Sequence, residues 1–531
     1  MLPILTPEQM RFADRYAIET LHISPAILME GAARAAFERI YPHMKSHAAL
    51  SHRSQLSIVI LCGSGNNGGD GFALARLFSH YADVRVVWIG AKEKMTPETR
   101  MNFDLLATHT IPTLHCTSET ILAKGELQRL LRDADCVLDA LIGNGGTEHL
   151  RGVVVDILRE INATRRSDRL DIAIDIPTGL NAETGKAHVN CFRAEITVSL
   201  AALKTGLLLN NAPEYVGQCI TVPIGIPADF LNKQATVRVI EEQDKERMFQ
   251  ARPRNATKHD FGSVAIIGGT LSMPGAPALA ANACIAAGAG LVKMFTPSAH
   301  SAVFPEVMTE LLRVHTNGSI ARENIEILQR SLEKHSVFVI GPGLGKDEET
   351  LAVIREIIAR VREEQSLVID ADGLRAVQMD TDMFLPLHPH TVLTPHRGEF
   401  ARMTGINYTS IPDNAHTLAS QWAAKLGCTV LLKNVPTIIS NGTTSFWNTS
   451  GNAGMATAGS GDVLAGIIGA FLAQRNIHGW DFTETVAMAA YCHGLAGDFA
   501  AAALGQQNVT ASSIIRYLSD VFPKFQRPHW L

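Results

Sequence analysis

A short apolar run, a glycine-rich loop and a helical pattern follow one another in the stretch Ile58-Val-Ile-Leu-Cys-Gly-Ser-Gly-Asn-Asn-Gly-Gly-Asp-Gly-Phe-Ala-Leu-Ala-Arg-Leu77. The apolar run has the length of a buried strand, and the segment after the glycines is typical of a helix. Glycines between a strand and a helix leave free N–H groups at the helix N-terminus, which is a phosphate-binding geometry. The spacing is not the dinucleotide fingerprint, because Asn66, Asn67 and Asp70 interrupt it. The alternative is a tight glycine turn.

Strand patterns alternate with helical patterns along the rest of the chain. Thr6-Pro-Glu-Gln9 predicts a helix start with a capping box, and helix is expected through Ile40. Such alternation implies parallel strands and an α/β layered fold. The further expected strands are Val84 to Ile89, Cys136 to Leu138, Ile172 to Ile176, Val264 to Ile267, Val337 to Gly341, Leu367 to Asp370, Thr391 to Thr394 and Thr429 to Lys433.

The alternation breaks between Pro227 and Thr257. The charged run Glu241 to Arg247 lies there, and the segment Arg252 to Lys258 is typical of an exposed connection. We therefore place a domain boundary near residue 230, which gives two α/β domains, residues 1–230 and 231–531.

The composition excludes several classes of function. With 47 Lys and Arg against 52 Asp and Glu, the net charge is −5, so no nucleic-acid partner is expected. The eight cysteines form no C-x-x-C pair, which argues against a zinc site or a disulfide framework and favours a reducing cytoplasm. The N-terminus lacks the pattern of a secretory signal. The apolar segment Gly454 to Ala473 contains Asp462, which argues against a membrane span.

Two other strand ends in the first half carry carboxylates. Asp139 ends one expected strand, and Asp175 begins the motif Asp-Ile-Pro-Thr178-Gly-Leu-Asn. The carboxyl ends of parallel strands face one crevice, so these residues and Asn67 are expected to converge. Oxygen ligands of this kind suit an alkali or alkaline-earth cation beside a catalytic carboxylate. The alternative for each aspartate alone is a loop cap.

These motifs resemble the NAD(P)H-hydrate epimerase domain family, over roughly residues 1 to 228. The resemblance implies a Rossmann-like fold, with Asp175 acting on the hydrated nicotinamide ring. It also implies a potassium ion held by Asn67, Asp139 and Thr178, although the family usually has Ser at the last position. The nucleotide-binding positions would be Asn66, Asn67, Gly68, Gly69, Asp70, Gly143, Asn144, Gly145, Gly146, Thr147, Glu148 and His149, where Gly143 to Gly146 replace a more usual Gly-Thr-Gly-Leu.

The implied reaction suits a carboxylate. Hydrated NADH (NADHX) and hydrated NADPH (NADPHX) carry a hydroxyl group on the carbon next to the ring nitrogen. Loss and return of that oxygen through a cationic intermediate inverts the carbon centre. One carboxyl group can serve as acid and then as base, and Asp175 is the candidate.

The second half contains its own glycine run, Asn448-Thr-Ser-Gly-Asn-Ala-Gly-Met-Ala-Thr-Ala-Gly-Ser-Gly-Asp-Val-Leu-Ala-Gly466. A glycine run that opens a helix supplies backbone amides for an anion, and Asp462 lies at the helix start. This is typical of phosphoryl transfer; the alternative is a small-residue helix packed against a neighbour. Other motifs follow expected strands and can meet the run: Gly341-Pro-Gly-Leu-Gly345, Asp370-Ala-Asp-Gly-Leu374, Thr394-Pro-His-Arg-Gly-Glu399 and Lys433. Lys433 can neutralise phosphate, and Glu399 can hold magnesium directly or through water.

With Lys258-His-Asp-Phe-Gly262 and Met273-Pro-Gly-Ala276, these motifs resemble the NAD(P)H-hydrate dehydratase family over about residues 235 to 525. The fold implied is ribokinase-like. The whole chain is similar to the bifunctional bacterial family that repairs hydrated nicotinamide coenzymes. The resemblance implies dehydration of the S epimer of NADHX or NADPHX, with magnesium and with ADP converted to AMP and phosphate. ADP rather than ATP is expected because fusion of the two domains is typical of bacterial members.

The resemblance also assigns residues in the second half. Asp462 would be the catalytic base that accepts the proton of the substrate hydroxyl. The hydrated coenzyme would contact Ala276, Gly345, His396 and Asp462. The adenine nucleotide would be held by Lys433, Asn434, Val435, Pro436, Thr437, Asn452, Ala453, Gly454, Met455, Ala456, Thr457, Ala458, Gly459, Ser460 and Gly461. The family often has Pro in place of Arg397 and Gly in place of Asn434.

Two other functions fit part of the sequence. A small-molecule kinase of the ribokinase-like superfamily, with the first half as a regulator, explains Asp462 but not the first group of residues. A non-catalytic, nucleotide-sensing first half is opposed by the joint presence of Asn67, Asp139 and Asp175. We expect a cytoplasmic homo-oligomer that acts on small molecules and has neither a nucleic-acid nor a membrane partner.

Overall fold

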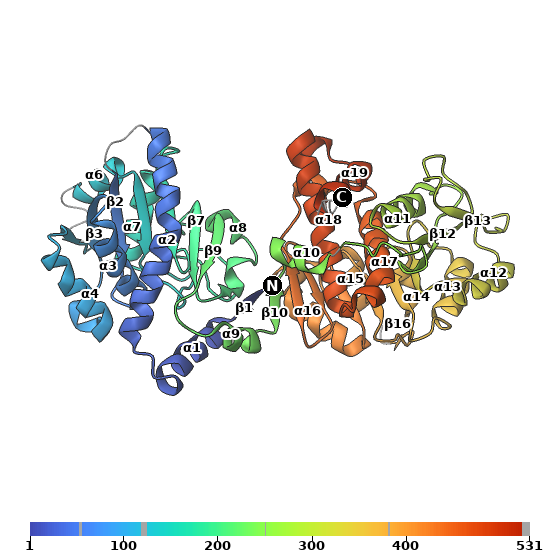
Figure 1. Cartoon of the computed structure of the whole chain (residues 1–531), viewed down its shortest axis with the longest axis horizontal. Coiled ribbons are helices and arrows are strands. Elements are labelled where there is room, and N and C mark those ends of the chain that lie inside the picture. Colours follow the sequence, from blue (N-terminus) through green and yellow to red (C-terminus); the bar gives the residue numbers. More distant parts are fainter. Residues whose placement is uncertain (52–55, 118–124, 250, 381–382, 523–531) are drawn as a thin grey trace, which may run out of the picture. The chain divides into compact units, whose positions relative to one another are not determined.

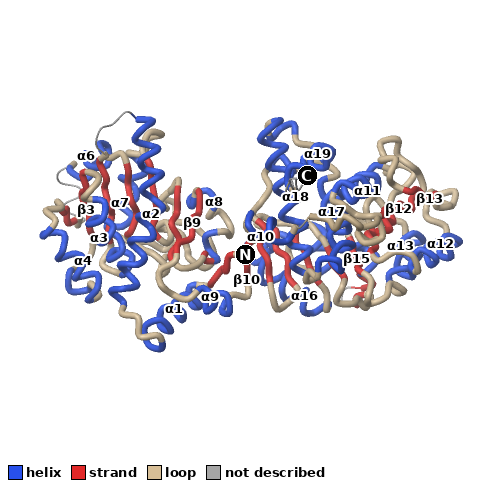
Figure 2. Tube along the Cα trace, in the orientation of Figure 1, coloured by secondary structure: helices blue, strands red, loops and turns tan. Residues whose placement is uncertain are grey.

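The structure is a computed structural model that describes residues 1–51, 56–117, 125–249, 251–380 and 383–522. Contacts divide the chain into two compact units (Figure 1). The N-terminal unit is Leu2–Thr236, and the C-terminal unit is Val237–Leu531 together with Met1. Each unit has strands in its interior and helices outside (Figure 2), so the expected α/β fold class is confirmed.

The main sheet of the N-terminal unit has the order β4-β3-β2-β5-β6-β7-β9, and all neighbouring strands run parallel. The bounds are Thr113–His115 for β4, Asp83–Trp88 for β3, Ser57–Cys62 for β2, Cys136–Ala140 for β5, Leu170–Ile174 for β6, Ile196–Leu200 for β7 and Gln218–Val222 for β9. From β4 to β7 this is the 3-2-1-4-5-6 order of a Rossmann-like sheet, as expected. The strand order reverses beside β2, so the ligand-binding end of the sheet lies at the carboxyl ends of β2 and β5.

Helices cover both faces of this sheet. Ile58 and Ile60 of β2 pack in one core with side chains of α2 and α3, whereas Val59 and Leu61 pack in another with α6 and α7. The alternation follows from the two-residue period of a strand and gives three layers. The helices and helical turns are α1 (Pro7–Arg15), η1 (Tyr16–Thr20), α2 (Pro25–Ser51), α3 (Asn66–Phe78), η2 (Lys92–Lys94), α4 (Pro97–Thr108), α6 (Glu126–Asp133), α7 (Val153–Ala163), η3 (Thr205–Leu207), α8 (Pro213–Val216) and α9 (Ala228–Gln234).

The first residues of the N-terminal unit form a strand and then the expected helix. Strand β1 (Leu2–Leu5) pairs in parallel with β8 (Leu203–Lys204). The predicted capping box is confirmed, because Thr6 Oγ1 accepts from the Gln9 N–H at 3.1 Å and Gln9 Oε1 accepts from the Thr6 N–H at 2.9 Å. The box fixes the start of α1, which forms part of the first site.

The sheet of the C-terminal unit has the order β13-β12-β11-β14-β15-β18-β19-β20-β21-β10. Neighbours run parallel except in the antiparallel pairs β19–β20 and β20–β21. The bounds are Met308–Leu311 for β13, Leu291–Thr296 for β12, Ser263–Ile267 for β11, Val337–Ile340 for β14, Ser366–Ile369 for β15, Thr391–Leu393 for β18, Thr429–Leu432 for β19, Thr437–Ser440 for β20, Ser445–Asn448 for β21 and Val237–Val239 for β10; β16 (Gln378–Asp380) and β17 (Met383–Phe384) pair separately. The order reverses beside β11, so the ligand-binding end lies at the carboxyl ends of β11 and β14.

Helices also cover both faces of this second sheet. Val264 and Ile266 pack in a core with α11, α17 and α18, and Ala265 and Ile267 pack with α12 and α13. The helices and helical turns are α10 (Glu242–Met248), α11 (Gly275–Ala286), η4 (Arg322–Asn324), α12 (Ile325–Leu332), α13 (Glu348–Ile358), α14 (Gly373–Val377), α15 (Arg397–Thr404), η5 (Tyr408–Ser410), α16 (Ile411–Leu426), η6 (Ala453–Met455), α17 (Ser460–His478), α18 (Phe482–Leu504), η7 (Gln506–Asn508) and α19 (Ala511–Val521). Among the residues that the structure describes, no helix is both long and apolar enough to cross a membrane.

The charged segment after residue 240 is more ordered than its sequence suggests. It forms helix α10, in which Asp244 and Lys245 are only 4% and 6% exposed. The N-terminal ammonium group of Met1 lies 2.6 Å from Asp244 Oδ1, which compensates the buried charge. The guanidinium group of Arg252 lies over the ring of Phe261 at 3.8 Å. The prediction for Arg252 to Lys258 is confirmed, because this segment consists of loop and turns and all its residues except Ala256 are exposed.

Candidate functional site

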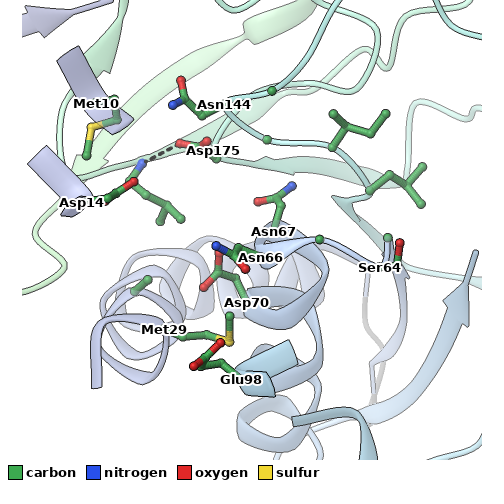
Figure 3. Close-up of a pocket in the computed structure, with 18 of the residues that line it drawn as sticks. Met10, Asp14, Met29, Ser64, Asn66, Asn67, Asp70, Glu98, Asn144 and Asp175 are labelled. Atoms are coloured by element: carbon green, nitrogen blue, oxygen red, sulfur yellow. Dashed lines mark hydrogen bonds between the residues drawn. The ribbon is translucent and has the colours of Figure 1, made fainter. Parts of the chain in front are cut away.

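A cavity of about 710 Å³ opens in the N-terminal unit at the carboxyl ends of β2 and β5. Its walls come from α1, α2, the start of α3 and the loops after β2, β5 and β6. Figure 3 shows Asp14, Asp70, Asn67 and Asp175 around this space. The topological position is where α/β sheets of this type bind their ligands.

The glycine loop after β2 shapes one wall of this cavity. Helix α3 begins at Asn66, so Asn66 and Asn67 lie in its first turn, Asp70 lies just past that turn, and none of the three is in the loop itself. A Cβ atom at Gly68 would lie only 1.9 Å from the carbonyl oxygen of Gly63, so the loop can pack this closely only with glycine there. The close packing leaves the backbone at the helix N-terminus beside the cavity.

Asn67 and Asp139 are buried polar groups at the carboxyl ends of two neighbouring strands. Both amide atoms of Asn67, Oδ1 and Nδ2, are buried without a hydrogen-bond partner. Asp139 accepts from the Thr178 N–H at 2.7 Å and from the Thr178 hydroxyl at 2.8 Å. Burial raises the pKa of Asp139 to about 6, although the hydrogen bonds from Thr178 and Leu141 oppose the shift. A cation would satisfy the Asn67 oxygen and favour the ionised form of Asp139.

These oxygen atoms fit potassium better than a transition metal. The described residues contain no group of three or more His, Cys, Asp or Glu side chains placed to hold a metal ion. An amide oxygen, a hydroxyl oxygen and one carboxylate are hard ligands of low total charge, which suits an alkali cation.

Asp175 follows β6 in a left-handed backbone conformation, with φ of 68°. Such a conformation is uncommon for a residue with a side chain and is concentrated at functional sites. The Asp175 N–H donates to Val198 O at 2.7 Å, and the Asp175 carboxylate forms a buried ion pair with Lys204. A Cβ atom at Gly143 would lie 2.9 Å from Asp175 Oδ2 and 3.1 Å from Asn67 Cγ. The structure thus places Asn67, Gly143 and Asp175 side by side.

Two more carboxyl groups line the same cavity. Burial raises the pKa of Asp14 to about 6, with Lys204 lowering it and Asp175 raising it. Burial also raises the pKa of Asp70 well above its usual range, and Asp175 and Asp14 add to the rise. The cavity therefore holds two carboxyl groups whose pKa values are raised by burial, and carboxyl groups with raised pKa values are typical of acid and base catalysis.

The second site forms around the start of α17 in the C-terminal unit. Gly459, with φ of 88°, precedes the helix, and Asp462 lies in its first turn. A Cβ atom at Gly461 would lie 3.3 Å from Lys433 Nζ and 3.9 Å from Asp370 Oδ2. Lys433 Nζ in turn donates to Asp370 Oδ1 at 2.7 Å. The helix N-terminus and the Lys433–Asp370 pair therefore form one continuous site.

Asp462 and Lys433 have shifted pKa values because charges crowd this site. Burial raises the pKa of Asp462 to about 7, and Asp370 adds to the rise while Lys433 opposes it; Asp372 and Glu399 raise it further. Burial alone would lower the pKa of Lys433, but Asp370 and Glu399 outweigh burial and raise it. A carboxyl group with a pKa near 7 can serve as a general base near neutral pH. Magnesium is usually held by one or two carboxylates together with substrate phosphates, so it needs no group of three protein ligands, and Asp370 and Asp462 suit that role.

His396 is placed by its local hydrogen bonds at the start of α15. Its Nδ1 atom accepts from the Gly398 N–H at 2.9 Å, and Glu399 Oε2 accepts from the His396 N–H at 2.8 Å. Burial lowers the pKa of His396, so the imidazole is neutral, although Glu399 opposes the shift. His396 is therefore a helix cap whose Nε2 atom, 3.4 Å from Glu399 Oε1, is the remaining donor.

The loops that flank the second site are held by two other aspartates. Asp372 Oδ2 accepts from the Gly345 N–H at 3.0 Å. Asp498, on α18, accepts from the Gly451 N–H and from Asn452 Nδ2, both at 2.9 Å. These bonds fix the positions of the glycine loops before any ligand binds.

Comparison with known proteins assigns both halves. The family model described as YjeF-related protein N-terminus matches residues 25–206, and the model described as NAD(P)H-hydrate dehydratase matches residues 264–520. The bifunctional NAD(P)H-hydrate repair enzyme of Moorella thermoacetica is 33% identical over 526 residues, which cover 98% of this chain and 96% of that protein. The chain belongs to the family of bifunctional NAD(P)H-hydrate repair enzymes. The resemblance found in the sequence is thereby confirmed.

Other members and structures share parts of this similarity. The bifunctional NAD(P)H-hydrate repair enzyme of Leishmania braziliensis is 33% identical over 534 residues, covering 95% of this chain and 91% of that protein. A crystal structure of a ribokinase-like superfamily protein from Enterococcus faecalis is 31% identical, with a TM-score of 0.46, and covers 54% of this chain and 97% of that chain.

The structure brings only some of the expected epimerase residues to the first cavity. Its lining includes Asn66, Asn67, Asp70, Gly143, Asn144, Gly145 and Asp175. Gly68, Gly69 and the segment Gly146 to His149 are absent from the lining among the described residues. Glu148 accepts instead from Asn181 Nδ2 at 2.6 Å, and this bond lowers the pKa of Glu148. Gly146 remains next to the lining loop, because its N–H donates to Gly143 O at 2.7 Å.

The sequence analysis of this repair-enzyme chain missed Asp14, Lys204 and Asp498. Asp14 lies on α1 near the buried residues Met10 and Ala13, and a carboxylate on that face is a detectable signal. Lys204 follows the strand Ile196 to Leu200, which was not recognised as a strand. Asp498 is a charge within a long alanine-rich helix. In each case the signal is a charge on an apolar element, which is rarely tolerated without a partner.

Proposed function

We propose that this chain repairs hydrated nicotinamide coenzymes in two steps at two sites. Residues 1–230 would interconvert the R and S epimers of NADHX and NADPHX, and residues 231–531 would dehydrate the S epimer to NADH or NADPH. The observation that carries the proposal is that each unit has its own carboxylate at the ligand-binding end of its own sheet, Asp175 in one and Asp462 in the other. Membership of the bifunctional family supports the pairing of the two activities.

In the epimerase site, Asp175 would protonate the departing hydroxyl oxygen and then take a proton from the returning water. Asn66 to Asp70 and the segment Gly143 to His149 would hold the nucleotide. Of these residues, Asn66, Asn67, Asp70 and Gly143 to Gly145 line the cavity. Asn67, Asp139 and Thr178 would hold the potassium ion, whose positive charge orients anionic and polar groups of the substrate. The unpartnered amide oxygen of Asn67 is the evidence for that ion.

In the dehydratase site, Asp462 would accept the proton of the substrate hydroxyl as the oxygen attacks the terminal phosphorus of the nucleotide. The bond from that phosphorus to the nucleotide's bridging oxygen breaks. Phosphate later leaves the ring carbon in place of hydroxide, and the neighbouring ring carbon loses a proton to solvent as the double bond of NADH forms. Backbone amides of Gly459 to Gly461 would stabilise the transferred group, and Lys433 would neutralise its charge. Magnesium would offset the phosphate charge beside Asp370 and Asp462, and Ala276, Gly345 and His396 would contact the ring.

The nucleotide would lie along the loops Lys433 to Thr437 and Asn452 to Gly461, the second of which is anchored by Asp498. We propose ADP as the co-substrate, giving AMP and phosphate. A two-part relative from Leishmania shows that domain fusion is not confined to bacteria, so the fusion alone does not select ADP. The test is to incubate the S epimer with ADP or with ATP and to quantify NADH and phosphate. One phosphate per NADH with ADP supports the proposal, and turnover with ATP alone contradicts it.

We further propose a cytoplasmic homo-oligomer that acts on NADHX, NADPHX and ADP and binds neither nucleic acid nor membrane. All eight cysteines are free thiols, which suits a reducing compartment. The net charge of −5 suits small phosphorylated ligands held by loop amides more than a nucleic-acid surface. Light scattering of the purified chain would test the oligomeric state.

Potassium is expected to stabilise the N-terminal unit. Binding at 100 times the dissociation constant adds about 2.7 kcal/mol, and a domain of this size gains about 2 to 4 °C in melting temperature per kcal/mol. Because a metal ligand must be deprotonated and Asp139 has a pKa of about 6, the shift should be larger at pH 8 than at pH 5. Calorimetry in potassium, sodium and lithium chloride at equal ionic strength measures this. Equal shifts with all three ions, or a potassium shift that Asp139→Asn retains, would exclude the site.

Dehydration is expected to slow as the pH falls below about 7. Asp462 acts as a base only when ionised, and its pKa of about 7 means that kcat/KM should drop tenfold per pH unit below that value. Asp372→Asn removes one of the carboxylates that raise this pKa and keeps an oxygen for the Gly345 N–H. In this variant the fall in kcat/KM should therefore begin at a lower pH than in the parent protein. Two results would contradict the assignment of Asp462 as the base. One is a kcat/KM for dehydration that does not change between pH 5.5 and 8 in the parent protein, and the other is a fall that begins at the same pH in Asp372→Asn as in the parent.

A further inference from the structure

Lys204 lies at the wall of the first cavity and has no role in the function proposed so far. We propose that Lys204 is a positioning residue of the epimerase site: its ammonium group holds one carboxylate oxygen of Asp175, so that the other oxygen faces the substrate. This inference rests on the proposed epimerase activity. It concerns a residue that acts through Asp175 and does not itself touch the reacting atoms.

The hydrogen bonds of Lys204 use its full set of donors. Lys204 Nζ donates to Asp175 Oδ1, to Leu200 O at 2.6 Å and to Ser199 Oγ at 3.3 Å. An ammonium group has three N–H donors, so these three partners satisfy it. Its side chain is only 1% exposed, and removing one member of a buried ion pair leaves a charge without compensation. The position of the Asp175 carboxylate is therefore tied to that of Lys204.

The bonds to Asp175 fall on one of its two oxygen atoms. Oδ1 accepts from Lys204 and also from the Leu200 N–H at 3.3 Å. Oδ2 points to the opposite side, where a Cβ atom at Gly143 would approach it to 2.9 Å. Gly143 and Asn67 both line the cavity. Oδ2 is thus the oxygen that faces a bound nucleotide, with a lone pair available for proton transfer.

The backbone near Lys204 is folded to make this contact. After β7 the chain turns at Ala201, which has φ of 66°, and the Ala202 N–H donates to Leu200 O at 2.9 Å. The turn brings Lys204, in β8, back beside Ser199 and Leu200. Asp175 also has a left-handed backbone, so both partners lie in locally strained segments. Strain of this kind persists only where surrounding contacts hold it, and the Lys204 contacts do so.

The charges around Lys204 explain why its contact with Asp175 matters. Lys204 faces Asp14 from α1, Asp70 from α3 and Cys219 from β9, in addition to Asp175. Its three donors go to Asp175 and to two neutral oxygens, so its ion pair is with Asp175 and not with Asp14 or Asp70. Without Lys204, the Asp175 carboxylate would lose the hydrogen bond that fixes its orientation beside two other acidic groups.

The test compares Lys204→Ala and Lys204→Gln with the parent protein and with Lys233→Met, a surface lysine of the same unit. Full-length proteins are assayed for epimerisation of NADHX and, as an internal control, for dehydration of the S epimer. We expect kcat for epimerisation to fall about 10²-fold, the cost of a misplaced catalytic group, whereas KM and dehydration stay within a few-fold. Ethylammonium ions should restore part of the rate to Lys204→Ala, and ethanol should not, because the missing group is a charge that the open cavity can admit.

The outcomes distinguish failure of the proposed epimerase activity from failure of the positioning role of Lys204. A parent protein that does not epimerise NADHX refutes the epimerase activity itself. If the parent protein is active, two results overturn the positioning role. One is a kcat for epimerisation that is unchanged in the Lys204 variants, and the other is a slow Lys204→Ala whose rate ethylammonium ions do not increase. A change in KM alone would assign Lys204 to substrate binding and overturn it equally. Lys204→Gln keeps a hydrogen-bond donor without the charge. If Lys204→Ala melts at a much lower temperature than the parent, Lys204→Gln takes its place in the test, with kcat expected to fall and KM to stay unchanged.

Discussion

Asp462→Asn is expected to abolish nucleotide-dependent dehydration and to leave epimerisation at its normal rate. Asparagine keeps the size of the side chain at the start of α17 but cannot accept the proton of the substrate hydroxyl. Loss of a general base typically lowers kcat about 10² to 10⁴-fold. The loss should appear in kcat and kcat/KM together, because the missing interaction is made only in the transition state. The measurement is recovery of NADH absorbance from the pure S epimer with ADP.

The matched control is Asp347→Asn in the same unit. Asp347 caps α13 by accepting from the N–H groups of Glu349 and Thr350, and asparagine is an equally good cap. That variant should dehydrate the S epimer at the parent rate. Loss of both activities in Asp462→Asn, with a normal melting curve, would argue against two independent sites.

Asp175→Asn is expected to have the opposite effect, abolishing epimerisation and sparing dehydration of the S epimer. The carboxylate held by Lys204 is the proposed acid and base, and its loss should lower kcat for epimerisation about 10² to 10⁴-fold. The measurement is the rate at which pure R epimer becomes S epimer, followed by chromatography without any nucleotide.

Asp104→Asn serves as the control for this variant. Asp104 is exposed and pairs with Arg100 one turn away on α4, so its removal should change stability little. Epimerisation by Asp175→Asn at the parent rate would refute the assigned role. Removal of both activities would instead indicate that the variant had unfolded, which the melting curve of the C-terminal unit would reveal.

The strand ends were the most predictable part of the fold. The expected strand Ile58 to Leu61 is β2, and Leu367 to Asp370 corresponds to β15 with Asp370 just past its end. Helices cover both faces of a parallel sheet, so its buried strands are runs of apolar residues. The positions of these strands can therefore be recognised in the sequence. The segment Glu241 to Arg247 was harder, because its order depends on Met1, which is distant in the sequence.

Residues of the two sites could be predicted from the sequence where they lie within a recognisable motif. The glycine runs before Asp70 and Asp462 carry local signals. The structure places Asp462 in the first turn of α17 and Asp70 just past the first turn of α3. Lys204 and Asp14 carry no such signal. Their function depends on tertiary folding that brings α1 and the turn after β7 to Asp175, and a single sequence does not encode that proximity in any local pattern.

His396 shows a different limit. Its motif Thr-Pro-His-Arg-Gly-Glu suggested a ligand contact, and the structure adds that Nδ1 is used as a helix cap. Only Nε2 remains for a substrate, which the residue type alone could not tell.

The most direct test of the account is recovery of NADH from an equilibrium mixture of R and S NADHX with excess ADP and magnesium. The account predicts that the parent chain converts the whole mixture, because epimerisation refills the S epimer as dehydration consumes it. It also predicts that Asp175→Asn stops at the fraction present as S and that Asp462→Asn recovers none. A parent protein that stops at the S fraction, or that recovers no NADH with ADP, would contradict the two-site repair function.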